Sequence, residues 1–520
     1  MDNTASESQP FKPFAESDIW QLNRDYYEET GIDAWRSGVV PHHMTSNSMV
    51  GRTYAELILA FLYDVAEQVN IIDTVYILEL GAGHGRLAYH ILQHLEKLIQ
   101  MHKEKLPPFC YILSDIVEED LLFYKNHLQL KKFFELGILD VAYFDAVSSK
   151  EIKLWHADKT IGVGELKQPI VALGNYFFDS LPVDLFRVQD HEMASCAVSV
   201  STTTDPEVDD FTSIIKSIKL EYQNTPVVMP FYADKIENEI LSEYLNKGLN
   251  TYLFFPRKSM HCLDNLAQLS EKGLMALSMD KGYHEMVDID NQPKPNVIKH
   301  GSFSFWVNYH GLGAYCNKKG GISLFPNYST FHIELACFLM LDQCDLYRHT
   351  AFAYERLVND FGPDDIDTIK KLAYKNAFEL ELFEIIALIR MAAYDSSFFM
   401  KFLPRIKILV QNISIEDRRR LSQILSQVGY FYFHIGEPED VAYEIGGLYY
   451  DLGYYEESLM YFQTSIMHYG DKEDAYYNMG LCYYNLRMDV QFVDILKKVR
   501  QLFPHSPFIA QLEKLDLLAV

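Results

Sequence analysis

Residues 76–90 read Tyr-Ile-Leu-Glu-Leu-Gly-Ala-Gly-His-Gly-Arg-Leu-Ala-Tyr-His and contain the pattern that decides the fold. An apolar run ends at Glu79. Three glycines then follow at every second position: Gly81, Gly83 and Gly85. Apolar residues with helical spacing continue from Leu87 to Leu98. This order predicts a strand, a glycine loop and a helix, in which the glycines allow a tight turn and let a ligand approach bare backbone.

The spacing of the three glycines narrows the choice of ligand. A dinucleotide loop carries G-x-G-x-x-G, with the pyrophosphate over the N-terminus of the helix. Here the pattern from Glu79 onward is E-x-G-x-G-x-G, which disfavours a nicotinamide oxidoreductase. The alternative to a ligand site is an ordinary glycine turn in an α/β domain, because short motifs match by chance.

Composition indicates a large globular protein. The chain has 520 residues, of which 48% are hydrophobic and 23% are charged, so about three domain-sized units are expected. The formal net charge of −26 argues against nucleic acid as the main partner, because phosphate binding needs clustered Lys and Arg. An acidic surface is compatible with a basic protein substrate, although it also serves solubility alone.

The cysteines and the N-terminus bear on the compartment. Seven scattered cysteines without a C-x-x-C pair favour reduced thiols and a cytoplasmic setting. The first ten residues are polar and acidic and resemble neither a secretory signal nor a transit peptide. We expect residues 1–16 to be mobile. No apolar stretch reaches the roughly 20 residues needed to span a bilayer, so no membrane partner is expected.

Three further short strands follow the first, each closed by a polar residue. They cover residues 111–113, 141–144 and 170–174, and helical patterns separate them. Alternating strands and helices predict a parallel sheet, whose ligands bind beyond the carboxyl ends of the strands. The polar residues expected at that edge are Glu79, Asp115, Asp145 and Asn175.

The C-terminal third reads as helical. A Gly-Pro-Asp-Asp break at 362–365 separates two helices, with the acidic residues at the start of the second. Residues 445–450 recur at 479–484, and Gly446 and Gly480 lie 34 residues apart, which is the tetratricopeptide period. Two units are too few for a free-standing solenoid, so the preceding helices are expected to cover them. We therefore expect a connecting region at 346–435 and tetratricopeptide-like repeats at 436–520.

The fourth strand runs into Asn175-Tyr-Phe-Phe-Asp-Ser-Leu-Pro182, which resembles the N-E-F-F-D-A-L-P signature of the MidA-like methyltransferases. Residues 79–85 resemble the family's E-L-G-P-G-R-G, itself the first motif of class I S-adenosylmethionine (AdoMet) methyltransferases, and residues 279–283 resemble its I-D-Y-G-H/Y. The family includes the mitochondrial complex I assembly factor that methylates a protein arginine. The resemblance covers roughly residues 20–340 and defines a domain at 17–345.

This resemblance implies a class I methyltransferase fold: a Rossmann-like α/β sheet with helices on both faces, followed here by the all-α region. It implies AdoMet as cofactor. Two family acids are missing, because Tyr176 replaces a glutamate and Asn308 stands near a family aspartate. If those carboxylates bind a guanidinium, arginine specificity is weakened.

Each candidate residue has an alternative role. Glu79 would hold the cationic end of AdoMet or bond only to the loop backbone. Asp115 would accept from the ribose hydroxyls or cap a helix over 116–126. Asp145, with Ala146, would reach the adenine or form a turn.

Asn175 and Asp179 are the candidate catalytic residues. An asparagine amide both donates and accepts, which suits a nitrogen substrate beside the methyl group. Asp179 would alternatively cap the turn before Leu181. Methyl transfer asks for alignment more than for acid–base chemistry.

The sequence therefore predicts an AdoMet-dependent methyltransferase that acts on a protein, with arginine suggested by the resemblance alone. The C-terminal repeats are expected to bind that protein or another partner. The alternative is an inactive MidA-like scaffold whose helical region does the work.

Overall fold

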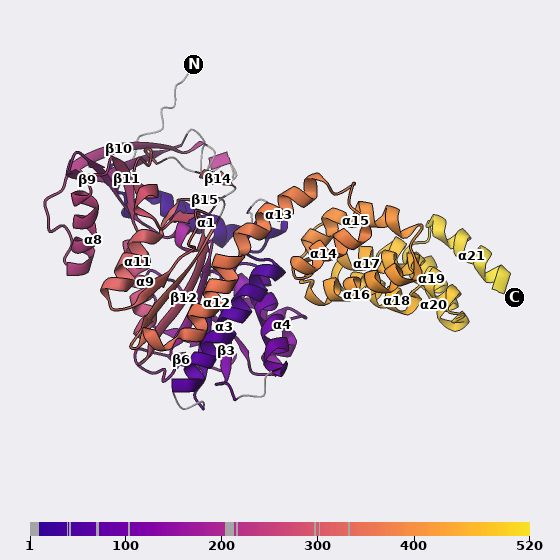
Figure 1. Ribbon diagram of the computed structural model, residues 1–520. Coiled ribbons are helices and arrows are strands. Elements are labelled where there is room, and N and C mark those ends of the chain that lie inside the picture. Colours follow the sequence, from indigo (N-terminus) through magenta and orange to yellow (C-terminus); the bar gives the residue numbers. More distant parts are fainter. Residues whose placement is uncertain are drawn as a thin grey trace, which may run out of the picture. The chain divides into compact units, whose positions relative to one another are not determined.

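The computed structural model describes residues 10–38, 40, 43–68, 72–101, 105–202, 213–214, 217–295, 298–300, 302–330 and 333–519 (Figure 1). The chain divides into two compact units. Residues 1–46 and 50–365 make up the first, and residues 47–49 and 366–520 make up the second. The sequence placed the boundary at 345, some twenty residues earlier than this division.

A mixed sheet forms the centre of the first unit. Its strands lie in the order β17 (Ile322–Leu324), β18 (Glu334–Leu341), β12 (Gly273–Asp280), β7 (Ile170–Asn175), β2 (Val75–Glu79), β3 (Phe109–Asp115), β4 (Leu139–Tyr143), β5 (Ile152–Leu154) and β6 (Lys159–Ile161). The strands from β12 to β4 are parallel, and β18 runs antiparallel to β12. The expected parallel strands are confirmed, and Glu79, Asp115 and Asn175 each end one of them, whereas Asp145 lies two residues after the end of β4.

The order of the parallel strands reverses between β2 and β7. Counted from β2 as the first, the strands read 3-2-1-4-5 across the sheet. In open α/β sheets ligands bind in the crevice at such a reversal, outside the carboxyl ends of the strands. Glu79 and Asn175 end the two strands that flank it.

Helices cover both faces of this sheet (Figure 1). The helices are α3 (Ser48–Gln68), α4 (Arg86–Met101), α5 (Glu118–Asn126), α9 (Arg257–Ala267), α11 (Tyr309–Lys318) and α12 (Arg348–Tyr354). The first turns of α4 are wholly buried, from Arg86 to Leu95. The helix therefore leads from the glycine loop straight into the core. A class I methyltransferase-type α/β fold is confirmed.

A second, antiparallel sheet flanks the first unit's N-terminal helices. It contains β1 (Lys12–Pro13), β9 (Glu192–Ser201), β8 (Asp184–Gln189) and β11 (Thr251–Phe255), and β10 (Lys219–Pro226) also pairs with β9. Lys12 and Pro13 pair with β9, and Phe14 is 1% exposed. Residues 12–16 are thus packed, contrary to the expected mobile terminus, because Phe14 buries an aromatic ring against Trp20 and Phe254. Residues 1–9 lie outside the described part.

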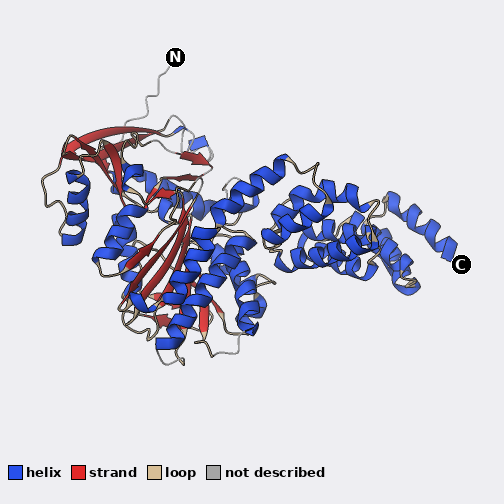
Figure 2. Cartoon of the chain, viewed as in Figure 1, coloured by secondary structure: helices blue, strands red, loops and turns tan. Residues whose placement is uncertain are grey.

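The second unit is built of helices and loops in its described residues (Figure 2). Its helices are α13 (Pro363–Lys375), α14 (Leu382–Met391), α15 (Ser396–Val410), α16 (Ile415–Phe431), α17 (Val441–Asp451), α18 (Tyr455–Tyr469), α19 (Glu473–Asn485), α20 (Asp489–Leu502) and α21 (Pro507–Ala519). The two copies of the repeat lie in α17 and α19, each at the start of a helical hairpin. One hydrophobic cluster runs from Ala373 to Tyr461, across the boundary expected at 435.

Candidate cofactor site

A cavity of about 360 Å³ opens at the carboxyl ends of β2, β3 and β7. It contains most of the residues that the sequence singled out: Glu79, Gly81, Gly83, Asp115, Asp145, Ala146 and Asn175. Gly85 and Asp179 are not among the residues that line it. The sheet therefore brings together residues that are almost a hundred positions apart in the chain.

The glycine loop is held in left-handed backbone conformation. The φ angles of Gly81, Gly83 and Gly85 are 59°, 57° and 73°. Residues other than glycine rarely adopt such positive φ angles. The Gly83 N–H donates to Asp115, and the Tyr124 hydroxyl donates to the Gly83 carbonyl. The N–H and the carbonyl of Gly83 are therefore both hydrogen-bonded, and the backbone of Gly81 and Gly83 lines the cavity.

Glu79 is a buried carboxyl that lines the cavity. It is 4% exposed, and its Oε2 accepts a hydrogen bond from the Tyr111 hydroxyl at 2.8 Å. Burial raises the pKa of Glu79 to about 8; the bond from Tyr111 lowers the pKa and the charge of Asp115 raises it. A cationic ligand would offset the cost of ionising this group. The site therefore suits the sulfonium and ammonium of AdoMet.

Asp115 joins β3 to the glycine loop. Its Oδ2 accepts from Gly83 at 3.1 Å, and its Oδ1 accepts from the N–H groups of Ile116 and Val117. Burial raises the pKa of Asp115, although the three N–H groups lower it. Helix α5 begins at Glu118 and its N-cap is Val117, so the expected helix over 116–126 starts two residues later and Asp115 is not its cap.

Asp145 carries an ion pair that the sequence did not indicate. Its Oδ2 lies 3.0 Å from Arg24 of helix α1 (Asp18–Thr30), and its Oδ1 accepts from the N–H of Val147. Although burial raises it, the pKa of Asp145 is lowered overall by the hydrogen bonds and the charge of Arg24 and by the bond from Val147. The turn role of Asp145 is thus observed, and its contact with adenine stays a prediction.

The Asn175 amide is held by two hydrogen bonds. The Tyr54 hydroxyl donates to its Oδ1 at 2.6 Å, and its Nδ2 donates to the carbonyl of Thr45 at 3.1 Å. A backbone carbonyl only accepts, so the nitrogen must face Thr45 and the oxygen must face Tyr54. Among the described residues, one N–H and one oxygen lone pair of Asn175 are left without a partner and are open to a ligand.

Asp179 is buried outside the cavity lining. It is 7% exposed and its side chain bonds to Ser304. Burial raises the pKa of Asp179 to about 7, while Ser304 and Lys281 lower it. The sequence offered Asp179 as a catalytic residue or a turn cap. The structure places it away from the cavity lining, and its side chain does not cap the 3-10 turn Phe178–Ser180.

The residue that caps this turn is Asp280, at the end of β12. Its Oδ2 accepts from the N–H groups of Phe177 and Phe178 at 3.3 and 3.1 Å. Burial, together with the charge of Asp179, raises the pKa of Asp280 well above its usual range. Asp280 thereby holds Phe177 against the loop, where a Cβ on Gly81 would meet the ring at 3.1 Å.

The two residues that stand in place of the family acids, Tyr176 and Asn308, lie in different parts of the first unit. Tyr176 lines the cavity, with a φ of 48°. Asn308 is 1% exposed and caps α11: its Oδ1 accepts from Gly311, and its Nδ2 donates to the carbonyl of Phe254. A carboxylate could not make that donation. Asn308 is not a cavity-lining residue, so only Tyr176 bears on the ligand.

Helices α1 and α2 (Asp33–Arg36) contribute side chains that the sequence analysis missed. Those that line the cavity are Trp20, Gln21, Asn23, Arg24, Tyr27 and Trp35. No motif marks them, because they come from a segment that precedes the sheet. The signal available in the sequence was the density of aromatic residues before the first strand.

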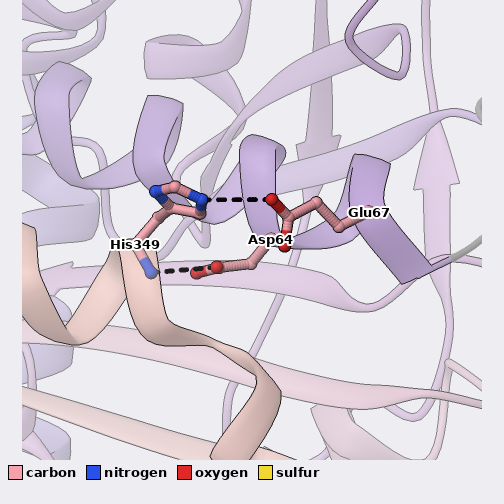
Figure 3. A group of neighbouring side chains, drawn as sticks. All are labelled: Asp64, Glu67 and His349. Carbon is pink, nitrogen blue, oxygen red and sulfur yellow. Dashed lines mark hydrogen bonds and ion pairs between the residues drawn. The ribbon is translucent and has the colours of Figure 1, made fainter.

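Another cluster of polar side chains lies on α3 and α12, outside the cavity (Figure 3). Asp64 accepts from the N–H groups of His349 and Thr350 and from the Thr350 hydroxyl. The exposed Glu67 pairs with the His349 ring at 3.3 Å. Asp64 therefore anchors the N-terminus of α12 to α3, which accounts for its burial.

Residues 57–295 match the model of a protein family described as "Putative S-adenosyl-L-methionine-dependent methyltransferase". This segment, which is less than half of the chain, is similar to that methyltransferase family. It contains both strands at the reversal, the glycine loop, Asn175 and Asp280. The chain is an AdoMet-dependent methyltransferase, and the MidA-like resemblance agrees with this assignment.

Two crystal structures from Burkholderia thailandensis are similar to the methyltransferase, each at 12% identity. One is of an uncharacterised superfamily protein. The match covers 65% of this chain and 90% of that protein's chain, with a TM-score of 0.39. The other, from the same superfamily, is described as a "likely methyl transferase" bound to S-adenosyl-homocysteine; it covers 63% of this chain and 88% of its own, with a TM-score of 0.40. At this identity and TM-score, residue roles are not carried over from either structure to this chain. The search of curated proteins found no match.

The lining of the methyltransferase cavity fits AdoMet. Glu79 offers a carboxyl to the cationic end, and the positive-φ glycines leave backbone open to the ligand. Asp115 and Ala146 also line the cavity, and their contacts with the ribose and the adenine stay predictions. Within the described residues, no helix has the length and hydropathy needed to cross a membrane.

Proposed function

We propose that the methyltransferase acts on a side-chain nitrogen of a protein, with arginine as the acceptor that the family resemblance favours. The support for a basic acceptor is the acidity of the chain as a whole, because the cavity carboxyls are assigned to the cofactor and Asp145 is already paired with Arg24. The formal charge of −26 would attract a basic protein.

The observation that carries this proposal is the fixed amide of Asn175. It ends β7 at the strand reversal, beside the glycine loop. Its bonds to Tyr54 and Thr45 remove the freedom to flip, so its free lone pair and N–H have defined directions. An amide held in this way can accept an N–H of the acceptor and so turn the nitrogen lone pair toward the methyl carbon.

Positioning is the main demand of the reaction. The acceptor atom, the methyl carbon and the leaving sulfur must lie in line, and well-oriented reactants gain several kcal/mol over free ones, up to about 10 kcal/mol. We assign Glu79 to the cationic end of the cofactor and Asn175 to the acceptor. Asp179 is not assigned a direct contact, because it does not line the cavity.

The acceptor can be identified with methyl-labelled AdoMet. A lysate from cells lacking this protein, incubated with the purified enzyme, should show a labelled protein band, and hydrolysis should release a methylated basic amino acid. Asn175→Ala should leave that band unlabelled. Label found only in lipid, nucleic acid or small molecules would overturn the protein acceptor.

A second proposal concerns the helical hairpins of residues 436–520, for which the tetratricopeptide assignment stays a prediction. The 34-residue repeat and the paired helices α17–α18 and α19–α20 support recruitment of a protein by this region. We also place the enzyme in the cytoplasm, since all seven cysteines are free thiols. The scaffold alternative is not favoured, because an intact glycine loop is retained.

A further inference from the structure

One wall of the cofactor cavity comes from outside the family segment. The matched segment begins at residue 57, whereas α1 and α2 end before residue 37. These helices nevertheless line part of the cavity. They contribute aromatic rings, amides and the guanidinium of Arg24. A ligand enclosed by the glycine loop on one side therefore meets α1 and α2 on another.

Trp35 of α2 packs directly on the glycine loop. A Cβ built on Gly83 would lie 2.8 Å from the indole ring. The same ring lies edge-on to His84, with 5.8 Å between centroids, and it stacks on Tyr27 of α1. The loop thus has the small residue that the indole contact requires, as well as the open backbone that a ligand requires.

Arg24 ties α1 to the end of β4. Its Nη1 donates to Asp145 at 3.0 Å, its Nη2 donates to the Tyr143 hydroxyl at 3.3 Å, and its Nε donates to Glu28 at 2.8 Å. The Asp145 side chain is 14% exposed and that of Arg24 is 31% exposed. A partly buried, multiply bonded pair of this kind is worth more than a surface pair.

The segment is also anchored before α1. Lys12 and Pro13 pair with β9, and the Trp20 indole donates to the carbonyl of Phe14 at 2.8 Å. The start of α1 is therefore fixed to the second sheet, while Arg24 fixes its middle to β4. Movement of the wall away from the cavity requires the bonds of Arg24 to break.

We propose that α1 and α2 form the wall that retains the cofactor, and that Arg24 is a positioning residue that holds this wall through Asp145. The proposal rests on the AdoMet site described above and adds residues that the family segment does not contain. The wall limits how fast S-adenosylhomocysteine leaves after each turnover. Arg24 acts on retention and not on methyl transfer itself.

The test measures the release of S-adenosylhomocysteine from the full-length protein. Arg24→Met removes the ion pair and keeps the length of the side chain. Lys12→Met is the matched control, because it breaks the Lys12–Asp18 ion pair of the same N-terminal segment without touching the cavity. Asp145→Asn and the double variant show whether Arg24 acts through Asp145.

Arg24→Met should raise the dissociation rate about tenfold, since affinity changes within one site lie mostly in that rate. Asp145→Asn should raise the rate at least as much, because Asp145 is also the expected adenine contact, and the double variant should be no faster than Asp145→Asn. Raising salt from about 0.05 to 0.5 M should speed release from the wild type and not from Arg24→Met.

Three results would overturn the proposal. They are an unchanged rate in Arg24→Met, an equal rise in Lys12→Met, or additive effects of Arg24→Met and Asp145→Asn. A lower melting temperature with unchanged release would mean that Arg24 only braces the fold. A wild type that binds no S-adenosylhomocysteine would overturn the cofactor site itself, which is a separate failure.

Discussion

At the scale of single residues, the ionisation of Glu79 should control cofactor affinity. In the free protein its pKa is raised to about 8, chiefly by burial, so the carboxyl is mostly protonated at neutral pH. The sulfonium of AdoMet favours the carboxylate, so binding should lower this pKa and release a proton. Affinity should therefore rise as the pH increases toward about 8 and then level off.

Calorimetry between about pH 6 and pH 9 checks this prediction in the wild type and in Glu79→Gln. The amino group of AdoMet titrates near pH 8 as well, but it does so with both proteins. The difference between the two profiles therefore belongs to Glu79. Parallel profiles would mean that Glu79 does not meet the cationic end of the ligand.

Asn175 should matter for turnover more than for cofactor binding. Asn175→Ala should leave the affinity for AdoMet within a few-fold and slow methyl transfer about a hundredfold, or roughly 3 kcal/mol. Tyr54→Phe keeps the amide but removes the donor that holds its oxygen, so we expect a smaller loss in the same direction. Tyr354→Phe is the control, because it removes another buried hydroxyl bond that lies outside the cavity. Equal turnover of wild type and Asn175→Ala would refute the role.

At the scale of elements, the strands of the sheet could be predicted from the sequence. The side chains that reach the strand ends from distant segments could not. Apolar runs closed by Glu79, Asp115 and Asn175 are local signals, and parallel strands put such ends on one edge. The cap of the turn after Asn175 is a different case. It comes from Asp280, about a hundred residues later, and only the pairing of β12 with β7 brings it there.

The same limit applies to α1 and α2. Their cavity residues follow no motif, because their function depends on where the two helices pack and not on their spacing. Asp145 illustrates the consequence: the sequence indicated an acid at a strand end, but its partner Arg24 lies 121 residues away. Roles set by long-range packing are not encoded in any short stretch.

The glycine loop should fail when Gly83 gains a side chain. At a φ of 57° any Cβ is strained by about 1 to 2 kcal/mol, and it would also meet Trp35 at 2.8 Å. Gly83→Asp should therefore abolish binding of S-adenosylhomocysteine, which we expect in the wild type at micromolar affinity, about −8 kcal/mol.

Gly137→Ala is the matched control for this loop. Its φ is 70°, yet a Cβ there has nothing within 4 Å. It shares the backbone strain of Gly83 but not the clash, so it should lower stability and leave calorimetric binding intact. Retained binding in Gly83→Asp would show that the loop does not contact the ligand.

At the scale of the whole molecule, the division of the chain differs from the sequence-based one for a physical reason. Helix α12 belongs to the first unit, since Asp64 of α3 anchors its N-terminus. Helix α17 packs on α16, and the Tyr449 hydroxyl donates to the carbonyl of Ser422. A repeat period shows where similar units begin, but it does not show where the hydrophobic core ends.

This packing determines how recruitment by residues 436–520 must be tested. Removing them would expose the cluster that α17 shares with the preceding helices, so truncation confounds recruitment with stability. Surface substitutions in the full chain avoid that problem. Met460 and Met467 are 52% and 59% exposed on α18, and Asn485 of α19 donates to the Tyr450 hydroxyl of α17 on a partly exposed face.

We expect Met460→Lys with Met467→Lys, or Asn485→Arg, to reduce labelling of the acceptor band by about tenfold or more, because recruitment raises the local concentration of the acceptor. Binding of S-adenosylhomocysteine should stay unchanged, since every residue that lines the cavity lies in the first unit. The alternative is that these helices only stabilise the catalytic unit. In that case both surface variants would label the acceptor as the wild type does, while truncation would lower the melting temperature and the cofactor affinity together, and recruitment would be refuted.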